Sequence, residues 1–329
     1  MSRGVRRRIG IVGAGIAGLA CAEQLRGIGD IVLFDKGRRP GGRLATVTIG
    51  NASWDLGAPS FTARDPRFRA EVMRWREAGW VARWDDGPRN ALVGIPSMAS
   101  LVAEQSRGLN VRFGFSVQSL VTTDGGWVIE GERCQAGPFD GVVVAVPAEQ
   151  AAPLLALHDL KAARHAASVR SFPCWAVMVE FCRPLKPSGH LATDAGIFSV
   201  IANNRSKPGR GEAECWVLHA SAQWSQKHLE SSADNVAIQL LAELAETIGT
   251  DLPAHTFIKA HRWRFSRPCG QSDQVIWNSS LGLGACGDWC TEPTVEGAWL
   301  SGIQLAERMR ATLMDWEAPD LVEDLRDAG

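Results

Sequence analysis

The sequence contains no tyrosine, no Cys-x-x-C pair and no long apolar run. Its aromatic rings come from 13 tryptophans and 11 phenylalanines, so no mechanism that needs a tyrosine hydroxyl can operate here. Eight cysteines in 329 residues are too few for a disulfide scaffold, and the closest pair, Cys286 and Cys290, lacks the usual zinc-site spacing. No stretch reaches about 18 consecutive apolar residues. We therefore predict no metal site and no membrane-spanning helix.

An excess of charge of one sign is also missing. The chain has 35 basic and 36 acidic residues, which gives no overall field for nucleic acid or an anionic membrane. Its hydrophobic fraction of 45% is sufficient for a large core, and its length predicts about two domains. These values indicate a globular protein whose partners are small molecules. They leave its oligomeric state open.

The first 35 residues contain a nucleotide-binding pattern. A short apolar strand at residues 9–12 leads into Gly13, Gly15 and Gly18, which open a helix, and a second strand at 31–34 ends in Asp35. Gly13 makes the turn, Gly15 lets a pyrophosphate approach the backbone, and Gly18 lets helix and sheet pack closely. Asp35 follows Gly13 by 22 residues, where a carboxylate can accept ribose hydroxyls. The pattern predicts that a dinucleotide binds at the helix N-terminus.

The same segment also has some features of a secretory signal. Arginines precede an apolar run at residues 9–22, and Ala20-Cys21-Ala22 offers a small-residue cleavage site. We favour the nucleotide-binding interpretation, because a signal peptide needs neither the second strand nor the acid that ends it. The expected location is therefore the cytoplasm, with reduced thiols.

Two further segments favour FAD over NAD. Gly41-Gly42-Arg43 follows the second strand, and Arg43 can neutralise a phosphate or the flavin edge with its planar guanidinium. Near the other end of the chain, a strand at 281–286 ends in Gly287-Asp288, and a helix begins at about residue 295. Asp288 can bind the ribityl chain, while the helix directs its positive end at the flavin pyrimidine. The alternatives are a solvated Arg43 on a surface turn and a helix-capping Asp288.

The middle of the chain predicts two different sheets. An apolar run at 142–146 suits a buried parallel strand, whereas residues 168–265 contain antiparallel strands and a helix at about 233–248. We predict an α/β fold with a discontinuous Rossmann-type FAD-binding domain and a second, mixed-sheet substrate domain. The FAD-binding domain is expected to comprise residues 1–60, 96–167 and 275–315, the substrate domain residues 61–95 and 168–274, and an acidic tail residues 316–329.

These motifs resemble the FAD-binding oxidoreductases that include the monoamine oxidases, and among them the bacterial renalases. The resemblance runs from about residue 8 to about residue 312. It rests on longer motifs than the glycine fingerprint, namely Asp55-Leu56-Gly57-Ala58, Phe61-Thr62-Ala63-Arg64-Asp65, Asn203-Asn204-Arg205-Ser206-Lys207-Pro208, Leu218-His219-Ala220, Gln223-Trp224-Ser225, Ala260-His261-Arg262-Trp263, Cys286-Gly287-Asp288-Trp289-Cys290 and residues 295–302.

The resemblance implies a non-covalent FAD, with the adenine held by backbone near Val117. Two departures lie near the expected substrate entrance: Pro59-Ser60 replaces the Gln-Tyr of the family, and residues 84–98 are shortened. The implied cofactor-binding residues are Gly13, Gly15, Ala17, Gly18, Asp35, Lys36, Gly42, Arg43, Leu44, Gly57, Ala58, Pro59, Val117, Gly287, Asp288, Val295, Glu296 and Ala298.

For the reaction, the resemblance implies oxidation of 2- or 6-dihydro isomers of NAD(P)H to NAD(P)+, with O2 reduced to H2O2. A dinucleotide-like substrate needs cations, and residues 203–210 contain three of them, although a solvated basic loop is the alternative. His261 and Trp263 flank Arg262 on an expected strand, so they share one face. His219 is expected to be structural. The predicted substrate pocket comprises Ser60, Asn203, Arg205, Lys207, His261 and Trp263.

Two other functions stay open. One is a flavin amine oxidase or a desaturase-like dehydrogenase acting on a small amine or apolar substrate. The amine oxidases flank their substrate with an aromatic pair, for which Trp263, Trp216 or Trp289 would have to replace tyrosine. The other is a flavin-binding protein without turnover, which Pro59-Ser60 alone supports.

Overall fold

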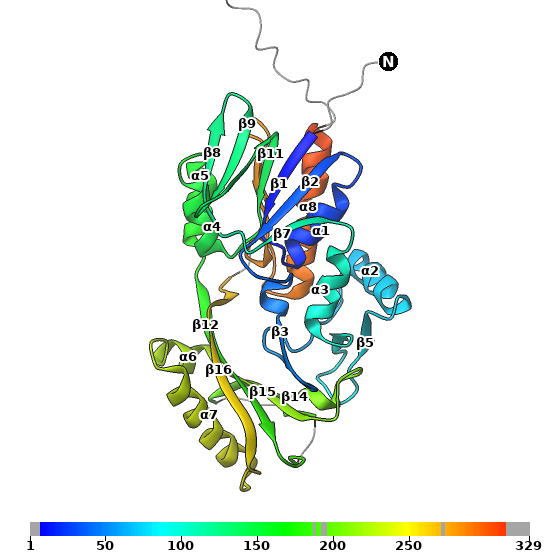
Figure 1. Cartoon of the computed structure of the whole chain (residues 1–329), viewed down its shortest axis with the longest axis vertical. Coiled ribbons are helices and arrows are strands. Elements are labelled where there is room, and N and C mark those ends of the chain that lie inside the picture. Colours follow the sequence, from blue (N-terminus) through cyan, green and yellow to red (C-terminus); the bar gives the residue numbers. More distant parts are fainter. Residues whose placement is uncertain (1–6, 187–188, 192–195, 271–273, 314–329) are drawn as a thin grey trace, which may run out of the picture.

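A computed structural model describes residues 7–186, 189–191, 196–270 and 274–313 (Figure 1). The acidic tail predicted at 316–329 and the first six residues lie outside this part of the chain. All eight cysteines lie within it as free thiols. The two largest sheets of the described chain occupy opposite ends of the molecule (Figure 1). Two long strands of the second sheet, β12 (Ser171–Phe181) and β16 (His255–Pro268), extend towards the first (Figure 1).

The first sheet is the predicted Rossmann-type sheet. Its central strands are short apolar runs that are buried on both faces, as Ile9, Ile11 and residues 142–144 show, and this pattern is typical of parallel strands. All neighbouring pairs are parallel except the edge pair β17–β18. The strands, in spatial order, are β17 (Ile276–Asn278), β18 (Leu283–Ala285), β11 (Gly141–Val144), β1 (Arg7–Val12), β2 (Gly29–Asp35) and β7 (Asn110–Phe113).

The first and last described helices pack side by side against this sheet (Figure 1). They are α1 (Ile16–Gln24) and α8 (Val295–Leu313), and seven residues of α1 are buried. Gly302 of α8 lies so close to α1 that a Cβ atom there would collide with the carbonyl oxygen of Ala17. Segments almost 280 residues apart in the sequence therefore form one layer.

A three-stranded sheet and two helices also belong to this half of the molecule (Figure 1). Two side chains of the three-stranded sheet, Ile129 and Phe139, pack against Gly10 of β1. A tight turn at residues 124–125 joins the first two strands of this sheet. The elements are β8 (Val117–Thr123), β9 (Gly126–Gly131), β10 (Gln135–Phe139), α4 (Ala148–Leu155) and α5 (Leu160–Ser168).

The second large sheet is antiparallel. One face packs against α7, whose bounds match the helix predicted at 233–248, through Val177, Trp216 and Leu240. Alternate residues of the same strands, such as Ala176 and Met178, form the other face. In spatial order the strands are β13 (His190–Leu191), β14 (Phe198–Asn203), β15 (Glu214–Ala220), β12 (Ser171–Phe181) and β16 (His255–Pro268), and the helices are α6 (Ala222–Lys227) and α7 (Ala233–Ile248).

A hairpin joins the two halves of the molecule. Its strands β3 (Thr46–Ile49) and β4 (Ala52–Asp55) follow the nucleotide-binding segment, yet Trp54 packs on Ala176 and Met178 of the antiparallel sheet. This hairpin lies within residues 1–60, which are predicted for the FAD-binding domain, but it packs on the antiparallel sheet. The domain boundaries stay a prediction. The remaining elements are η1 (Gly42–Leu44), α2 (Pro66–Glu77), β5 (Val81–Arg83), β6 (Leu92–Gly94), α3 (Met98–Ser106), η2 (Asn204–Ser206) and η3 (Asp288–Cys290).

Candidate functional site

The glycine turn before α1 has the geometry that a pyrophosphate needs. Gly13 has a φ of +108°, which favours glycine, and a Cβ atom on Gly18 would collide with the Gly13 carbonyl oxygen. A Cβ atom on Gly15, in contrast, would meet no protein atom within 4 Å. Gly15 is the N-cap of α1, and no side chain caps the helix there. The first-turn amides therefore have no side-chain cap, and the space beside Gly15 is open, which fits a bound phosphate.

Asp35 lies beside this turn. Its Oδ2 accepts a hydrogen bond from the Ala14 amide at 2.7 Å, and its Oδ1 accepts one from the Gly37 amide at 2.7 Å. A carboxylate has about four lone-pair sites, so both oxygens can still accept ribose hydroxyls. Lys36 is exposed, with its Nζ 3.5 Å from Gln150 Oε1.

The two ends of the chain meet in an ion pair between Arg43 and Asp288. The guanidinium donates two parallel hydrogen bonds to the carboxylate, at 2.7 and 2.6 Å, across 245 residues of sequence. It also donates to the Ser266 carbonyl at 3.0 Å. Fork-shaped contacts of this kind are among the strongest between charged side chains. The alternative of a solvated Arg43 on a surface turn is wrong.

The Gly57-Ala58 turn is held against the same arginine. The Ala58 amide donates to the Arg43 carbonyl at 2.9 Å, and the amides of Leu56 and Gly57 both donate to Ala45, at 3.0 and 3.2 Å. Leu44 is buried within η1. The structure therefore brings together three segments that the sequence predicted separately: Gly42–Leu44, Gly57–Ala58 and Gly287–Asp288.

The start of α8 lies next to these segments, but Glu296 has partners within the protein. Its buried carboxylate accepts hydrogen bonds from the amides of Arg64 and Asp65, at 2.7 and 2.6 Å. The Gly287 amide donates to Ser301 Oγ at 2.9 Å, which holds the end of β18 on α8. Ala298 is buried, Val295 is half-buried, and Val117 begins β8. Their contacts with a cofactor stay a prediction.

His261 and Trp263 lie on one face of β16, as their spacing predicts. Their rings are 4.6 Å apart, edge to face. Trp263 Nε1 donates to the Leu56 carbonyl at 3.2 Å, so this face of the antiparallel sheet reaches the Gly57-Ala58 turn. We call the face around His261 and Trp263 the wall. Ser60, also predicted for the pocket, follows that turn and is half-buried.

His219, for which the sequence predicts a structural role, also contacts the turn. Its Nε2 lies 3.1 Å from the Leu56 carbonyl, and burial lowers the pKa of His219 to about 4. The ring is therefore neutral near pH 7, and because its partner is a carbonyl, Nε2 is the donor. The strand register places His219, Ala176 and His261 in one row across β15, β12 and β16. No local signal in the sequence predicts that row.

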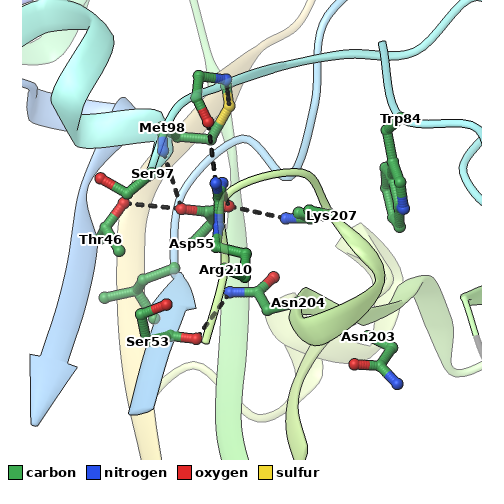
Figure 2. A network of polar contacts seen from close by, with 12 residues as sticks. Thr46, Ser53, Asp55, Trp84, Ser97, Met98, Asn203, Asn204, Lys207 and Arg210 are labelled. Carbon is green, nitrogen blue, oxygen red and sulfur yellow. Dashed lines mark hydrogen bonds and ion pairs between the residues drawn. The ribbon is translucent and has the colours of Figure 1, made fainter. Parts of the chain in front are cut away.

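The cations of the 203–210 loop bind acids of the protein itself. Lys207 Nζ and Arg210 Nη2 lie 2.9 and 2.6 Å from Asp55 Oδ2, and all three side chains are buried (Figure 2). Arg205 pairs with Glu212 and Glu214, at 3.0 and 3.3 Å. The loop was expected to present its charges to a substrate, and the structure does not bring Lys207 to solvent. No local feature of the sequence indicates the partner, Asp55.

Asn203 is likewise buried, and two of the three candidate tryptophans lie away from the wall. Asn203 Nδ2 donates to Glu214 Oε1 at 3.0 Å. Trp216 donates to the same oxygen at 2.8 Å and packs under α7, on the opposite face of the sheet from Trp263. Trp289 is buried and donates to the Val146 carbonyl at 2.9 Å. Of the three, Trp263 alone lies on the wall beside the turn.

A parallel sheet with a glycine turn, an acid after its second strand and an antiparallel sheet facing its cofactor turn define a flavoprotein oxidoreductase. A family model described as flavin containing amine oxidoreductase matches residues 82–310, and one described as NAD(P)-binding Rossmann-like domain matches residues 11–74. The chain belongs to the flavin-containing amine oxidoreductase family. It is therefore a flavin-dependent oxidoreductase, and the superfamily inferred from the motifs is confirmed.

Curated relatives match over very different lengths. Mouse renalase is 24% identical over 296 residues, which cover 79% of this chain and 85% of the relative. A coproporphyrinogen III oxidase of Mycobacterium leprae is 47% identical over 110 residues, which cover 28% of this chain and 24% of the relative. A phytoene desaturase of Myxococcus xanthus that forms zeta-carotene matches over 16% of this chain and 10% of its own length. The chain thus spans a quarter or less of these two relatives.

Solved structures share the fold. A candidate protoporphyrinogen oxidase from Exiguobacterium sp. 255-15 has a TM-score of 0.75 at 14% identity and covers 96% of this chain and 100% of its own. A double mutant of putrescine oxidase has a TM-score of 0.70 at 15% identity and covers 93% of this chain and 99% of its own. In the described part of the chain, no helix combines the length and apolar character needed to cross a membrane.

Proposed function

We propose that this protein is an FAD-dependent oxidase that acts on the 2- and 6-dihydro isomers of NAD(P)H. The proposed reaction is dihydro-NAD(P) + O2 + H+ → NAD(P)+ + H2O2. The observation that supports it best is the extent of the renalase match, which includes most of both chains. The porphyrinogen oxidase and desaturase matches, in contrast, cover small parts of those proteins.

The residues around the glycine turn fit a non-covalent FAD. The uncapped start of α1 would hold the pyrophosphate, Asp35 the adenosine ribose, and Asp288 with Arg43 the region of the ribityl chain and ring. When bound, the flavin supplies the hydride acceptor. The protein's own contribution is to bind the cofactor, orient the donor carbon and keep water out.

The wall beside the cofactor turn suits a donor that needs no base. Loss of hydride from a dihydronicotinamide restores an aromatic ring, so no proton has to leave with it. His219 is neutral and donates to Leu56, and burial lowers the pKa of His261 as well. An amine donor, in contrast, must arrive unprotonated. The wall residues His261, Trp263 and Ser60 would therefore orient the substrate rather than transfer a proton.

A flavin amine oxidase or desaturase-like dehydrogenase is the second candidate. One observation favours it: the cations of residues 203–210 pair with Asp55, Glu212 and Glu214, so they are not free to bind substrate phosphates. Arg205 is the most exposed of them, and its charge is shared between Glu212 and Glu214. The cytoplasmic location also stays a proposal.

An anaerobic reduction screen tests the proposal. The holoprotein would be mixed with dihydronicotinamide isomers made by borohydride reduction of NAD+, with ordinary NADH, and with a series of primary and secondary amines. We expect the isomers to bleach the flavin absorbance at about 450 nm within seconds, with NAD+ as the product, and oxygen to restore it with release of H2O2. Bleaching by amines but not by the isomers would favour the second candidate.

The control is a variant that cannot hold the cofactor. Gly15→Val places a branched side chain where the phosphate is proposed to lie, without meeting protein atoms at its Cβ. We expect a folded, colourless protein that neither bleaches nor consumes oxygen. A wild-type protein that binds FAD but is reduced by no donor would refute the proposed activity.

A further inference from the structure

Directly before the cofactor turn, the structure contains an ionic cluster with unequal charges, which we call the Asp55 cluster. It consists of Asp55, at the end of β4, and of Lys207 and Arg210, from the loop after η2 (Figure 2). None of the three side chains is more than 1% exposed. Asp55 is two residues before Gly57, so the acid of the cluster and the turn are parts of one short segment.

Asp55 is ionised in this environment. Its Oδ2 accepts from both cations, and its Oδ1 accepts from Thr46 Oγ1 at 2.8 Å and from the Met98 amide at 3.0 Å (Figure 2). Burial alone would raise the pKa of Asp55, but Lys207 and Arg210 lower it to about 2. An arginine stays protonated at any relevant pH. Burial lowers the pKa of Lys207, whereas its ion pair with the ionised Asp55, at 2.9 Å, raises it and favours the protonated ammonium. With both cations protonated, the carboxylate balances one of two positive charges.

The second positive charge has no other acid in contact with it among the described residues. The nearby Glu214 belongs to a separate group, in which it accepts from Arg205, Asn203 and Trp216. Lys207 Nζ also lies 5.1 Å from the centre of the Trp84 ring, which is not a counter-charge. A surplus buried charge is costly unless a neighbouring group compensates it.

The charge of Lys207 also acts at the turn. Burial is the main cause that lowers the pKa of His219, and the charge of Lys207 lowers it further. The His219 ring donates to the Leu56 carbonyl. The charge of Lys207 lowers the pKa of His190 in the same way. Leu56 lies between Asp55 and Gly57, and the Ala58 amide binds Arg43. The surplus charge therefore lies next to the segment that is proposed to border the flavin ring.

We propose that the surplus positive charge of the Asp55 cluster makes the bound flavin easier to reduce, with Lys207 as the residue that supplies it. This inference rests on the proposed FAD site. Two-electron reduction with uptake of one proton leaves the ring with one negative charge near N1. That charge compensates the surplus of the cluster, so the cluster stabilises the reduced flavin more than the oxidised one.

The size of the effect follows from Coulomb's law. Taking about 12 Å as the separation of Lys207 Nζ and the flavin ring, one unit charge at an effective dielectric constant of about 20 changes the reduction equilibrium about ten-fold. For a two-electron couple a ten-fold change corresponds to about 30 mV. Removal of the Lys207 charge should therefore lower the reduction potential of the bound flavin by roughly this amount.

The experiment measures the potential of the bound flavin without substrate. Each holoprotein would be reduced slowly under anaerobic conditions, at about pH 6, together with an indicator dye of known potential. Lys207→Met leaves a neutral Asp55–Arg210 pair, and we expect the potential of its flavin to be lower by about 30 mV. This shift corresponds to a ten-fold smaller equilibrium constant for reduction. Lys207→Arg keeps the charge and should keep the potential. Arg205→Met removes a cation of the same loop that is 38% exposed, where solvent screens its charge, and it should change the potential much less.

A second variant separates charge from packing. Asp55→Asn removes the negative partner and should raise the potential, opposite in sign to Lys207→Met, whereas loss of packing would move both variants in one direction. Equal potentials for Lys207→Met and the wild type would overturn the inference, and so would a lower potential for Lys207→Arg or for Asp55→Asn. A flavin that shows the expected potentials but is not reduced by dihydronicotinamides would refute the proposed substrate alone. A wild-type protein without flavin would refute both.

Discussion

Single polar contacts decide whether the cofactor segments stay together. The Leu56 carbonyl accepts from two side chains of the antiparallel sheet, His219 and Trp263, and the Arg43 guanidinium binds Asp288 from the other end of the chain. Each of these groups is at least partly buried, where an unpaired partner costs more than the contact itself contributes. Substitutions here should therefore affect both stability and flavin content.

Arg43→Met is the first such substitution. It leaves the Asp288 carboxylate, which is 9% exposed, without its cation, and we expect a loss of about 2 kcal/mol in the free energy of unfolding together with a lower flavin content. Arg43→Lys keeps the charge but not the two parallel bonds, so its loss should be about half as large. Urea unfolding and the ratio of flavin to protein absorbance measure both effects. An Arg43→Met protein as stable as the wild type would contradict the role of the pair.

His219 should make the protein sensitive to acid. The folded state holds this ring neutral with a pKa of about 4, whereas an unfolded histidine has a pKa of about 6.5. Below about pH 6.5 the unfolded chain therefore binds a proton that the folded chain excludes, and stability falls as the pH falls towards 4. From pH 7 to pH 5 this costs about 2 kcal/mol.

His219→Gln tests this dependence. The glutamine amide can still donate to Leu56 but does not titrate, so the variant should lose about 2 kcal/mol less than the wild type between pH 7 and pH 5, measured by urea unfolding. His255→Gln is the control, because His255 is exposed at the start of β16. If both variants lose as much stability as the wild type, His219 does not determine the acid response.

Among the elements, the turn before α1 combines two different demands on glycine. Gly18 is required by the protein itself, since a Cβ atom there would collide with the Gly13 carbonyl. Gly15 is not, since a Cβ atom there meets open space. The helix start is uncapped at the same place. One glycine thus serves the packing of helix and strand, and the other serves the approach of a ligand.

Gly15→Ala and Gly18→Ala should therefore differ. Without FAD, Gly15→Ala should be as stable as the wild type or slightly more stable, because alanine reduces the freedom of the unfolded chain, but it should bind FAD more weakly, by about ten-fold or more. Gly18→Ala should lower the melting temperature of the FAD-free protein by several degrees. Thermal unfolding with and without FAD measures both. Equal destabilisation of the FAD-free protein by the two substitutions would contradict the assignment.

In the whole molecule, the proposed cofactor would contact segments from both ends of the chain and from the middle. α1 and α8 pack together, Arg43 binds Asp288, and the β3–β4 hairpin connects this half to the antiparallel sheet. A ligand that binds the folded state alone stabilises it by an amount that grows with the logarithm of its concentration. Flavin binding and global stability should therefore be coupled.

Removal of the flavin should lower the stability of the whole protein. With free FAD at about 100 times its dissociation constant, the holoprotein should be more stable than the FAD-free protein by about 2.7 kcal/mol, and its melting temperature should rise with FAD concentration. Tryptophan fluorescence follows both halves, because Trp263 lies on the antiparallel sheet and Trp289 beside β18. A melting temperature independent of FAD would contradict a site built from the folded chain.

Several features could be predicted from the sequence because short-range rules determine them. The strands at 9–12 and 31–34, the glycine turn between them, the apolar strand at 142–146 and the helix at 233–248 all depend on residues that are neighbours along the chain. The side-chain alternation that places His261 and Trp263 on one face is equally local. The choice of a flavin site also followed from local motifs at the two ends.

The contacts that distinguish this site could not be predicted in that way. Asp55 lies 152 and 155 residues from the cations that bind it, and a loop with three positive charges looks the same in sequence whether it faces a substrate or a buried carboxylate. The position of His219 depends on the register of three strands. Local propensity thus determined the elements and the class of cofactor. The tertiary structure decided which charges are neutralised, because burial and pairing depend on distances that only the folded chain defines.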